Sequence, residues 1–159
     1  MNNRLNYPKL SSEAYNGFLA IEKILASSPV DRTIIHLVKI RVSQLNGCLF
    51  CLDLHSKEAR TDGERELRLH HLSLWHESSL YTEKEKAALE WAELLTKIKP
   101  HGVEDSDYDK IRIFFSEKEL SDLTFAIATI NMWNRFGVAF RSEAGSLDKL
   151  MGVDKIGLV

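Results

Sequence analysis

The organisation of the chain is decided by residues 41–60, which read RVSQLNGCLFCLDLHSKEAR. Apolar residues at helical spacing precede this stretch from Asp31 onward, and Asn46-Gly47 indicates a helix end, because glycine adopts the left-handed conformation that closes many helices. A second helix is predicted over residues 48–60. Successive residues of a helix are rotated by about 100°, so three side chains that carry chemistry share a narrow arc of one face: Cys48, Cys51 and His55.

The rest of the chain also shows helical spacing. Further helices are predicted over residues 12–27, 82–98 and 105–115 and from residue 116 onward, the last being the longest. Three Ser or Thr residues stand three positions before a Glu, which is the reciprocal capping pattern of a helix start: Thr61 with Glu64, Thr82 with Glu85, and Ser116 with Glu119. No segment alternates with the period of two that strands require. The sequence therefore predicts an all-α fold, a single-domain helical bundle over residues 1–159.

Composition and charge limit the classes of protein to consider. Hydrophobic residues make up 44% and charged residues 28% of the 159 residues, which is typical of a globular protein. The formal net charge of -2, with both signs interspersed, provides no field that would bind a nucleic acid or an anionic membrane. No apolar run has the length of a signal peptide or a membrane span, so a cytoplasmic location is expected.

The two cysteines suggest redox chemistry. Cys48 and Cys51 are too few for a disulfide framework, and a pair at this spacing in a reducing compartment is typical of a redox or metal site. The thiolate is the form that attacks a peroxide, so a nearby base must accept the thiol proton. We expect His55 to be that base for Cys51, one helical turn away, and Cys48 to resolve the resulting sulfenic acid as a disulfide.

Three other interpretations of the cysteine pair are open. A structural zinc site needs four ligands, and the sequence has no second cysteine pair or Cys/His pair at finger spacing. A thioredoxin-type exchanger places its motif beside a strand, which the helical spacing does not favour. Two buried free cysteines are the plainest alternative, although the presence of His55 argues against it. For the clustered His70, His71 and His76, no carboxylate or cysteine is expected at companion spacing on the same predicted face, so ordinary surface or interface histidines are favoured over a metal site.

A resemblance to a known family starts from the same residues 41–60. This stretch closely resembles the core of the carboxymuconolactone decarboxylase superfamily, in its alkyl hydroperoxidase D-like branch. Trp75, residues 81–89 and residues 130–136 resemble the same branch, so the similarity spans most of the chain.

The resemblance implies a helical domain of the alkyl hydroperoxidase D-like type that assembles into homo-oligomers, often trimers or hexamers. It also implies a peroxidase that reduces hydrogen peroxide or a small organic hydroperoxide without haem or a metal cofactor, and that is regenerated by a dithiol or a lipoylated protein. Carried over position by position, Cys51 matches the thiol that attacks the peroxide, Cys48 its disulfide partner and His55 a histidine of the proton relay.

One position departs from the family pattern. The best-known members of the branch have a glutamate twelve positions before the first cysteine, where it completes the relay, and this chain has His36 there. An imidazole can pass a proton, but it does not stabilise a protonated His55 as a carboxylate would. Glu58 is a candidate substitute, or simply an exposed residue of the helix. Gln44, two turns after His36, is a candidate holder of a bridging water, or a structural residue.

The sequence leaves three functions to separate. The first is a thiol-dependent peroxidase of antioxidant defence. The second is a non-catalytic redox-sensing or structural oligomer that uses the same cysteine pair, and the departure at His36 keeps it open. The third is the ring-opening or decarboxylase chemistry of the superfamily's founding enzymes, which does not depend on a cysteine pair. The intact pair argues against this third function.

Overall fold

The computed structural model describes residues 3–156, and this part of the chain folds into helices with no β-strand. The all-α prediction is confirmed. In chain order the helices are α1 (Tyr7–Leu10), α2 (Ser12–Leu25), α3 (Arg32–Asn46), α4 (Leu49–Thr61), α5 (Glu66–His71), the 3₁₀ helix η1 (Leu72–Glu77), α6 (Glu83–Thr96), α7 (Asp105–Arg112), α8 (Glu117–Phe140) and α9 (Asp148–Met151).

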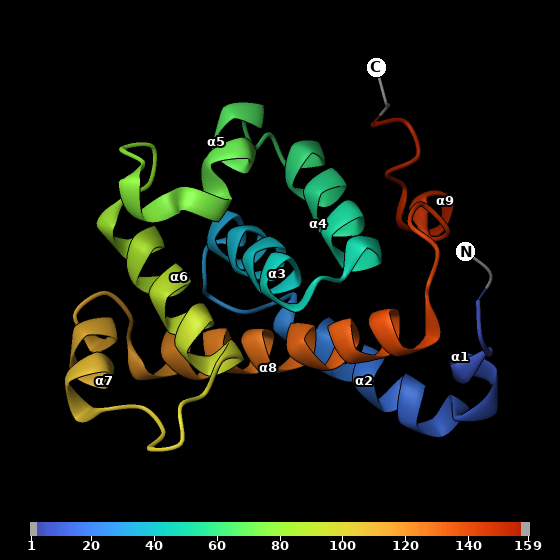
Figure 1. Ribbon diagram of the computed structural model, residues 1–159, viewed down its shortest axis with the longest axis horizontal. Coiled ribbons are helices and arrows are strands. Elements are labelled where there is room, and N and C mark those ends of the chain that lie inside the picture. Colours follow the sequence, from blue (N-terminus) through green and yellow to red (C-terminus); the bar gives the residue numbers. More distant parts are fainter. Residues whose placement is uncertain (1–2, 157–159) are drawn as a thin grey trace.

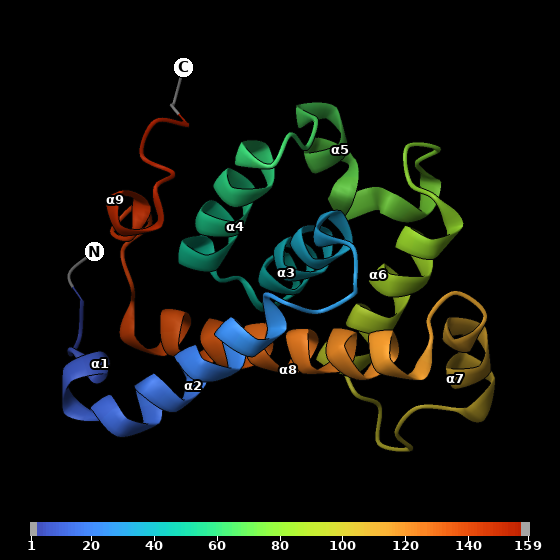
Figure 2. The same ribbon diagram turned by 180° about the vertical axis from the view of Figure 1, so that it is seen from behind.

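Helix α3 lies at the centre and packs against α4, α6 and α8. Figures 1 and 2 show α8 as a long base, with α3, α4 and α6 on one side of it and α2 running alongside. Successive residues of α3 are buried in different directions. Leu37 packs with Trp75 in one core cluster, and Val38 packs with Ile127 of α8 in another. This packing holds the end of α3, from which the cysteine pair follows.

Several helix starts lie where the capping signals predict them. Oδ1 of Asp31 accepts a hydrogen bond from the amide of Thr33 at 2.7 Å, which caps α3. Both reciprocal bonds of a capping box are present at the starts of α6 and α8, in the pairs Thr82 with Glu85 and Ser116 with Glu119. Short-range hydrogen bonding thus determines these boundaries, as the sequence pattern indicates.

The third capping pattern is misleading. Thr61 is the last residue of α4, and its hydroxyl donates back to the carbonyl of Lys57 at 2.8 Å. The next helix begins only at Glu66, and its N-cap residue, Arg65, makes no side-chain cap. The prediction of a helix start at Thr61 is wrong, because a threonine hydroxyl can bond within its own helix as well as cap a following one.

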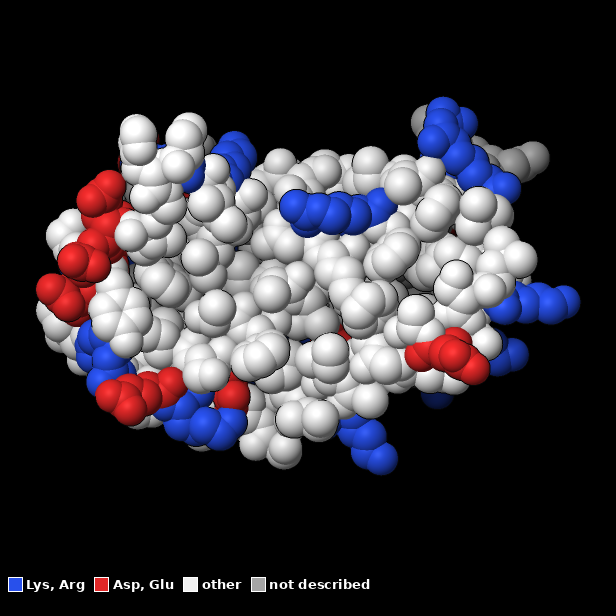
Figure 3. Space-filling view, turned by 90° about the horizontal axis from the view of Figure 1, so that it is seen from below, with Lys and Arg blue, Asp and Glu red and all other residues white. Residues whose placement is uncertain are grey.

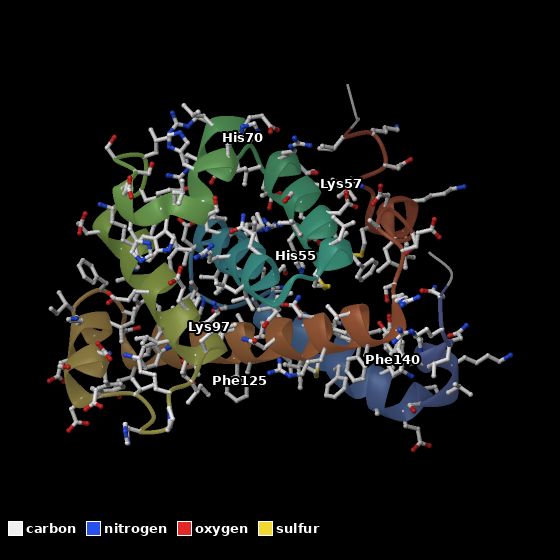
Figure 4. The ribbon with its side chains drawn as sticks, viewed as in Figure 1. His55, Lys57, His70, Lys97, Phe125 and Phe140 are labelled. Carbon is white, nitrogen blue, oxygen red and sulfur yellow. A yellow bond between two sulfur atoms is a disulfide. The ribbon has the colours of Figure 1, made fainter. Side chains whose placement is uncertain are left out.

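The face of α8 turned away from α3 is apolar and exposed. Phe125 lies on it with 57% of its surface exposed, and Figure 4 shows this side chain projecting to the side opposite α3. A shallow groove of about 410 Å³, lined by Ile98, Ala128 and Met132 among others, adjoins it. Figure 3, which looks at the molecule from this side, shows a broad surface with few charged side chains. None of the helices within residues 3–156 has the length and hydrophobicity that a membrane span needs.

The caps of α8 and α2 provide a matched pair of variants. Ser116→Ala should lower the free energy of unfolding by about 1 kcal/mol, because the hydroxyl accepts from the amide of Glu119. Ser11→Ala should change it far less, because the Ser11 side chain makes no cap hydrogen bond before α2. Urea unfolding of both variants checks this. Equal losses would show that the capping box of α8 contributes nothing specific.

Candidate active site

The turn between α3 and α4 sets the position of the cysteines. Helix α3 ends at Asn46, and Gly47 adopts a left-handed conformation with φ 65° and ψ 31°, which suits glycine because it has no Cβ. The amide of Cys48 then donates to the carbonyl of Ser43 at 3.0 Å. The chain reverses within two residues, and Cys48 becomes the N-cap residue of α4.

A cluster of polar side chains fixes this turn against α8. Nδ2 of Asn46 donates to Oδ1 of Asn131 and to Oδ1 of Asn134, at 2.9 Å each. Nδ2 of Asn134 in turn donates to Oγ of Ser43 at 3.1 Å. Because buried polar groups are costly without partners, these bonds favour one register of α3 against α8.

The two cysteines form a disulfide at the start of α4. Their Cα atoms are 5.4 Å apart, and each residue is only 2% exposed. Sγ of Cys48 also accepts from the amide of Cys51 at 3.4 Å. Free amides and the helix dipole favour negative charge at a helix N-terminus, so this position would stabilise a Cys48 thiolate after reduction.

Gly137 of α8 packs directly on the two sulfur atoms. A Cβ added at this position would lie 2.7 Å from Sγ of Cys48 and 3.4 Å from Sγ of Cys51. The first distance is too short for a van der Waals contact, so glycine is what lets α8 approach the disulfide this closely. Sequence reasoning missed this residue. A glycine inside a helical pattern hints at a close approach, but it does not identify the partner.

His55 lies on α4 one turn beyond Cys51 and is 8% exposed; Figure 4 shows it on the side of α4 that faces α3. Its Nδ1 is 2.6 Å from Oε2 of Glu58. A carboxylate only accepts, so Nδ1 carries the hydrogen and Nε2 of the neutral ring is free of one. Burial lowers the pKa of His55 below its ordinary value of 6.5, although the hydrogen bond with Glu58 offsets part of the effect. The ring is therefore neutral near pH 7, which is the form that a base needs.

Glu58 is the carboxylate of this pair. Its side chain is 23% exposed, so the alternative of an exposed surface residue is wrong. Burial alone would raise the pKa of Glu58, but the hydrogen bond from His55 and the electrostatic interactions with His55, Lys39 and His36 lower it below the ordinary value of 4.5. Glu58 thus places a negative charge beside His55, where a protonated imidazole would be stabilised.

His36 has a different partner. Its Nε2 is 2.7 Å from Oδ2 of Asp62, and the same oxygen binds Arg32 at 2.7 Å. His36 is 8% exposed, and its Nδ1 is buried without a hydrogen-bond partner in the described part of the chain. Within residues 3–156 no hydrogen bond joins His36 to His55. The structure thus places His36 beside the pair formed by His55 and Glu58, and not in it.

Gln44 and His71 make hydrogen bonds with partners other than the cysteines, His55 or Glu58. Oε1 of Gln44 accepts from Arg41 at 3.3 Å, so its expected role with a bridging water stays a prediction. Nδ1 of His71 is 3.0 Å from Oγ of Ser78. His70 is exposed, and its Nε2 lies 3.8 Å from Oε2 of Glu66, one helical turn earlier, so the expectation that these histidines have no carboxylate at companion spacing is wrong. In the part of the chain that the structure describes, no three His, Cys, Asp or Glu side chains form a group suited to a metal ion.

A partly buried lysine near the pair was also missed. Nζ of Lys39 on α3 binds Oε2 of Glu22 on α2 at 2.8 Å, and the Lys39 side chain is 14% exposed. Together with Glu58, these two residues contribute to the wall of a pocket of about 350 Å³ between α2, α3, α4, α8 and the C-terminal segment. The signal in the sequence is a lysine within the largely apolar run 34–40. Its partner on another helix cannot be inferred from spacing.

Comparisons with protein families and curated proteins place the site in a known context. The model of the carboxymuconolactone decarboxylase family matches residues 12–94, a range that includes both cysteines, His55 and Glu58. The uncharacterised protein YdfG of Bacillus subtilis is 40% identical over 146 residues, which are 92% of this chain and 99% of YdfG.

Two solved structures resemble this fold. One is a protein of unknown function from Agrobacterium tumefaciens, named as a candidate antioxidant defence protein AhpD; it has a TM-score of 0.85 and 43% identity over 90% of this chain and 98% of that chain. The other is an uncharacterised peroxidase-related protein from Silicibacter sp. TM1040, with a TM-score of 0.76 and 20% identity over 85% of this chain and 72% of that chain. The second likeness concerns the fold alone.

The contact between α8 and the disulfide predicts that a methyl group added at residue 137 destabilises the protein. Gly137→Ala should lower the free energy of unfolding of the oxidised protein by about 1–3 kcal/mol, because the new Cβ overpacks the sulfur atoms. Gly17→Ala is the control, since Gly17 lies within α2 with nothing near its Cβ position. This variant should gain about 0.5–1 kcal/mol. Urea unfolding measures both, and a Gly137→Ala protein as stable as the parent would contradict the packing.

The burial of His55 predicts a pH-dependent stability. Its pKa in the folded protein lies below the ordinary 6.5, so below about pH 6.5 the unfolded chain binds the proton more readily and the free energy of unfolding falls. The stability that Glu58 provides is lost at lower pH, as the pH falls from 4.5 through its depressed pKa. Thermal unfolding between pH 6.5 and 4.5 should therefore show a steeper decline for the parent than for His55→Gln. Parallel curves would contradict the burial of a neutral His55.

Proposed function

Because the chain belongs to the carboxymuconolactone decarboxylase family, we propose that it is a thiol-dependent peroxidase that reduces hydrogen peroxide or a small organic hydroperoxide. One observation carries the proposal. Two cysteines that form a disulfide lie at the N-terminus of α4, and the same helix holds the buried His55, hydrogen-bonded to Glu58. The Agrobacterium protein named for antioxidant defence, 43% identical to this chain, supports the same class.

In the first step Cys51 attacks the peroxide. Nε2 of His55 accepts the thiol proton, and the thiolate sulfur bonds to one peroxide oxygen while the O–O bond breaks. Cys51 becomes a sulfenic acid, and the other oxygen leaves as an alcohol, or as water from hydrogen peroxide, with a proton returned by His55. Glu58 stabilises the imidazolium form between these two transfers.

In the second step Cys48 resolves the sulfenic acid. The Cys48 thiolate, favoured by the helix N-terminus, attacks the Cys51 sulfur; the hydroxide leaves with a proton as water, and the disulfide forms. A dithiol, free or as a lipoyl group on a protein, then returns two electrons and two protons by thiol–disulfide exchange. His36 with Asp62, and a water held by Gln44, are the proposed outer path of the relay.

A non-catalytic redox sensor is the second candidate. The observation that favours it is the burial of both sulfur atoms, since Cys48 and Cys51 are each 2% exposed. A small peroxide reaches such a site more readily than a protein-borne dithiol does. In that case oxidation would occur once, and turnover with a dithiol would not follow.

Thiol counting separates these functions. The reduced protein, treated with a slight excess of hydrogen peroxide, should lose both thiols to an intramolecular disulfide, as measured by alkylation and mass, and a dithiol should then sustain peroxide consumption. Disulfide formation without turnover would favour the sensor. Cys48→Ser should stop at a sulfenic acid that a 1,3-diketone traps, whereas Cys51→Ser should not react. A Cys51→Ser protein that consumes peroxide as fast as the parent would refute Cys51 as the attacking thiol.

The base has its own test. His55→Gln should slow thiol loss near neutral pH by roughly 10²-fold or more, the usual contribution of a positioned base. Glu58→Gln should slow it by a smaller factor, because the imidazolium loses its carboxylate partner. Glu66→Gln, at an exposed glutamate of α5, is the matched control and should react as the parent does. Equal rates for Glu58→Gln and Glu66→Gln would remove Glu58 from the relay.

A further inference from the structure

Lys39 is an ammonium group held inside the fold next to the pair formed by His55 and Glu58. It belongs to α3, which packs against α4, and its side chain is 14% exposed. Lys39 and Glu58 both line the pocket of about 350 Å³, so they meet the same partly open recess. Charges in such a space act on each other more strongly than at an open surface.

The position of this ammonium group is fixed from two further helices. Glu22 of α2 binds Nζ of Lys39 through Oε2 at 2.8 Å. The other oxygen of Glu22 accepts a hydrogen bond from Nε1 of Trp133 on α8 at 3.0 Å. A lysine side chain loses much rotational freedom when it is ordered. The ion pair with Glu22, itself held by Trp133, offsets this loss and keeps the ammonium group in one position.

The charges around His55 and Glu58 come from several elements. Helix α2 contributes Glu22, and α3 contributes Lys39 and His36. The other acidic groups nearby are already paired: Asp62 binds Arg32 and His36.

Two more acidic groups approach from elements that pack near α4, and each has a lysine partner. Asp122 of α8 binds Lys118, and Asp148 of α9 binds Lys57. Lys39 is a cation whose charge acts on both members of the pair.

We propose that Lys39 is a positioning residue of the relay, whose charge keeps Glu58 ionised and His55 in the neutral, proton-accepting form. The positive charge of Lys39 lowers the pKa of His55, in addition to the larger effect of burial, and it also lowers the pKa of Glu58. Glu22 acts on His55 in the opposite direction. The link to peroxide chemistry rests on the proposed function, whereas the electrostatic effect does not.

Titration of the His55 imidazole by NMR tests the proposal directly. The oxidised protein is used, so that no thiol titrates nearby. Lys39→Met should shift the His55 midpoint upward, because a positive charge is lost and Glu22 is left without its partner. Lys39→Arg should restore the parent midpoint. Lys57→Met is the matched control, since this lysine on α4 is bonded to Asp53 and Asp148, and it should leave the midpoint in place.

Glu22→Gln adds a test of opposite sign. Removal of this negative charge should shift the His55 midpoint downward, which keeps the proposal testable if Lys39→Met does not fold. A role of Lys39 in packing alone would lower the thermal midpoint of unfolding and leave the titration unchanged. An unchanged His55 midpoint in both Lys39→Met and Glu22→Gln overturns the proposal.

The reaction provides a second readout. In the reduced protein, the pH at which peroxide-driven thiol loss is half-maximal should move upward in Lys39→Met and stay in place in Lys57→Met. If the protein does not consume peroxide but the His55 midpoint shifts as expected, the proposed function fails and the role of Lys39 stands. If peroxide is consumed and neither the midpoint nor the pH profile moves, the role of Lys39 fails and the peroxidase stands.

Discussion

The hydrogen bonds from Asn46 to Asn131 and Asn134 are the constraint on which the site depends. They join the last turn of α3 to α8 immediately before the reversal at Gly47, so they also determine where α4 begins. Apolar packing buries α3 but tolerates small shifts along its axis, whereas a cluster of amides is fully bonded in only one register. The location of the disulfide therefore follows from polar complementarity between two helices that are far apart in the sequence.

The distribution of charge over α3 and α4 is the second feature of the site. His55 finds its carboxylate three residues further along its own helix, in Glu58, so this pair forms as α4 folds. Helix α3 supplies a lysine and a histidine, Lys39 and His36, to the adjoining space. Glu58 thus belongs to the same helix as His55, whereas Lys39 approaches the pair from the neighbouring helix.

Local rules account for much of what the sequence predicts. Helical spacing brings Cys48, Cys51 and His55 to one helix, and the cap at Asp31 follows from one short hydrogen bond. The same rules fail at Thr61, where a hydroxyl has two local partners to choose from. Local rules also do not predict long-range contacts, because no spacing along the chain indicates which helix will lie next to another.

The features of the candidate site that the sequence does not predict are contacts between distant helices. The contact of Gly137 with the sulfur atoms and the ion pair of Lys39 with Glu22 both join distant helices. Glu58 is predicted only in part. Its spacing from His55 makes it a candidate, but only its burial and its 2.6 Å contact with His55 distinguish it from a surface residue.

At Gly137 the disulfide is faced by main chain and not by a side chain. Main chain in a helix has no rotamers, so this wall cannot swing aside as a phenylalanine or a leucine would. On this side, extra room for a third atom on either sulfur would require displacement of α8 or of the first turn of α4 as a rigid unit. A reaction that adds an atom to a cysteine sulfur is thereby coupled to the position of α8, the long helix that packs on the disulfide.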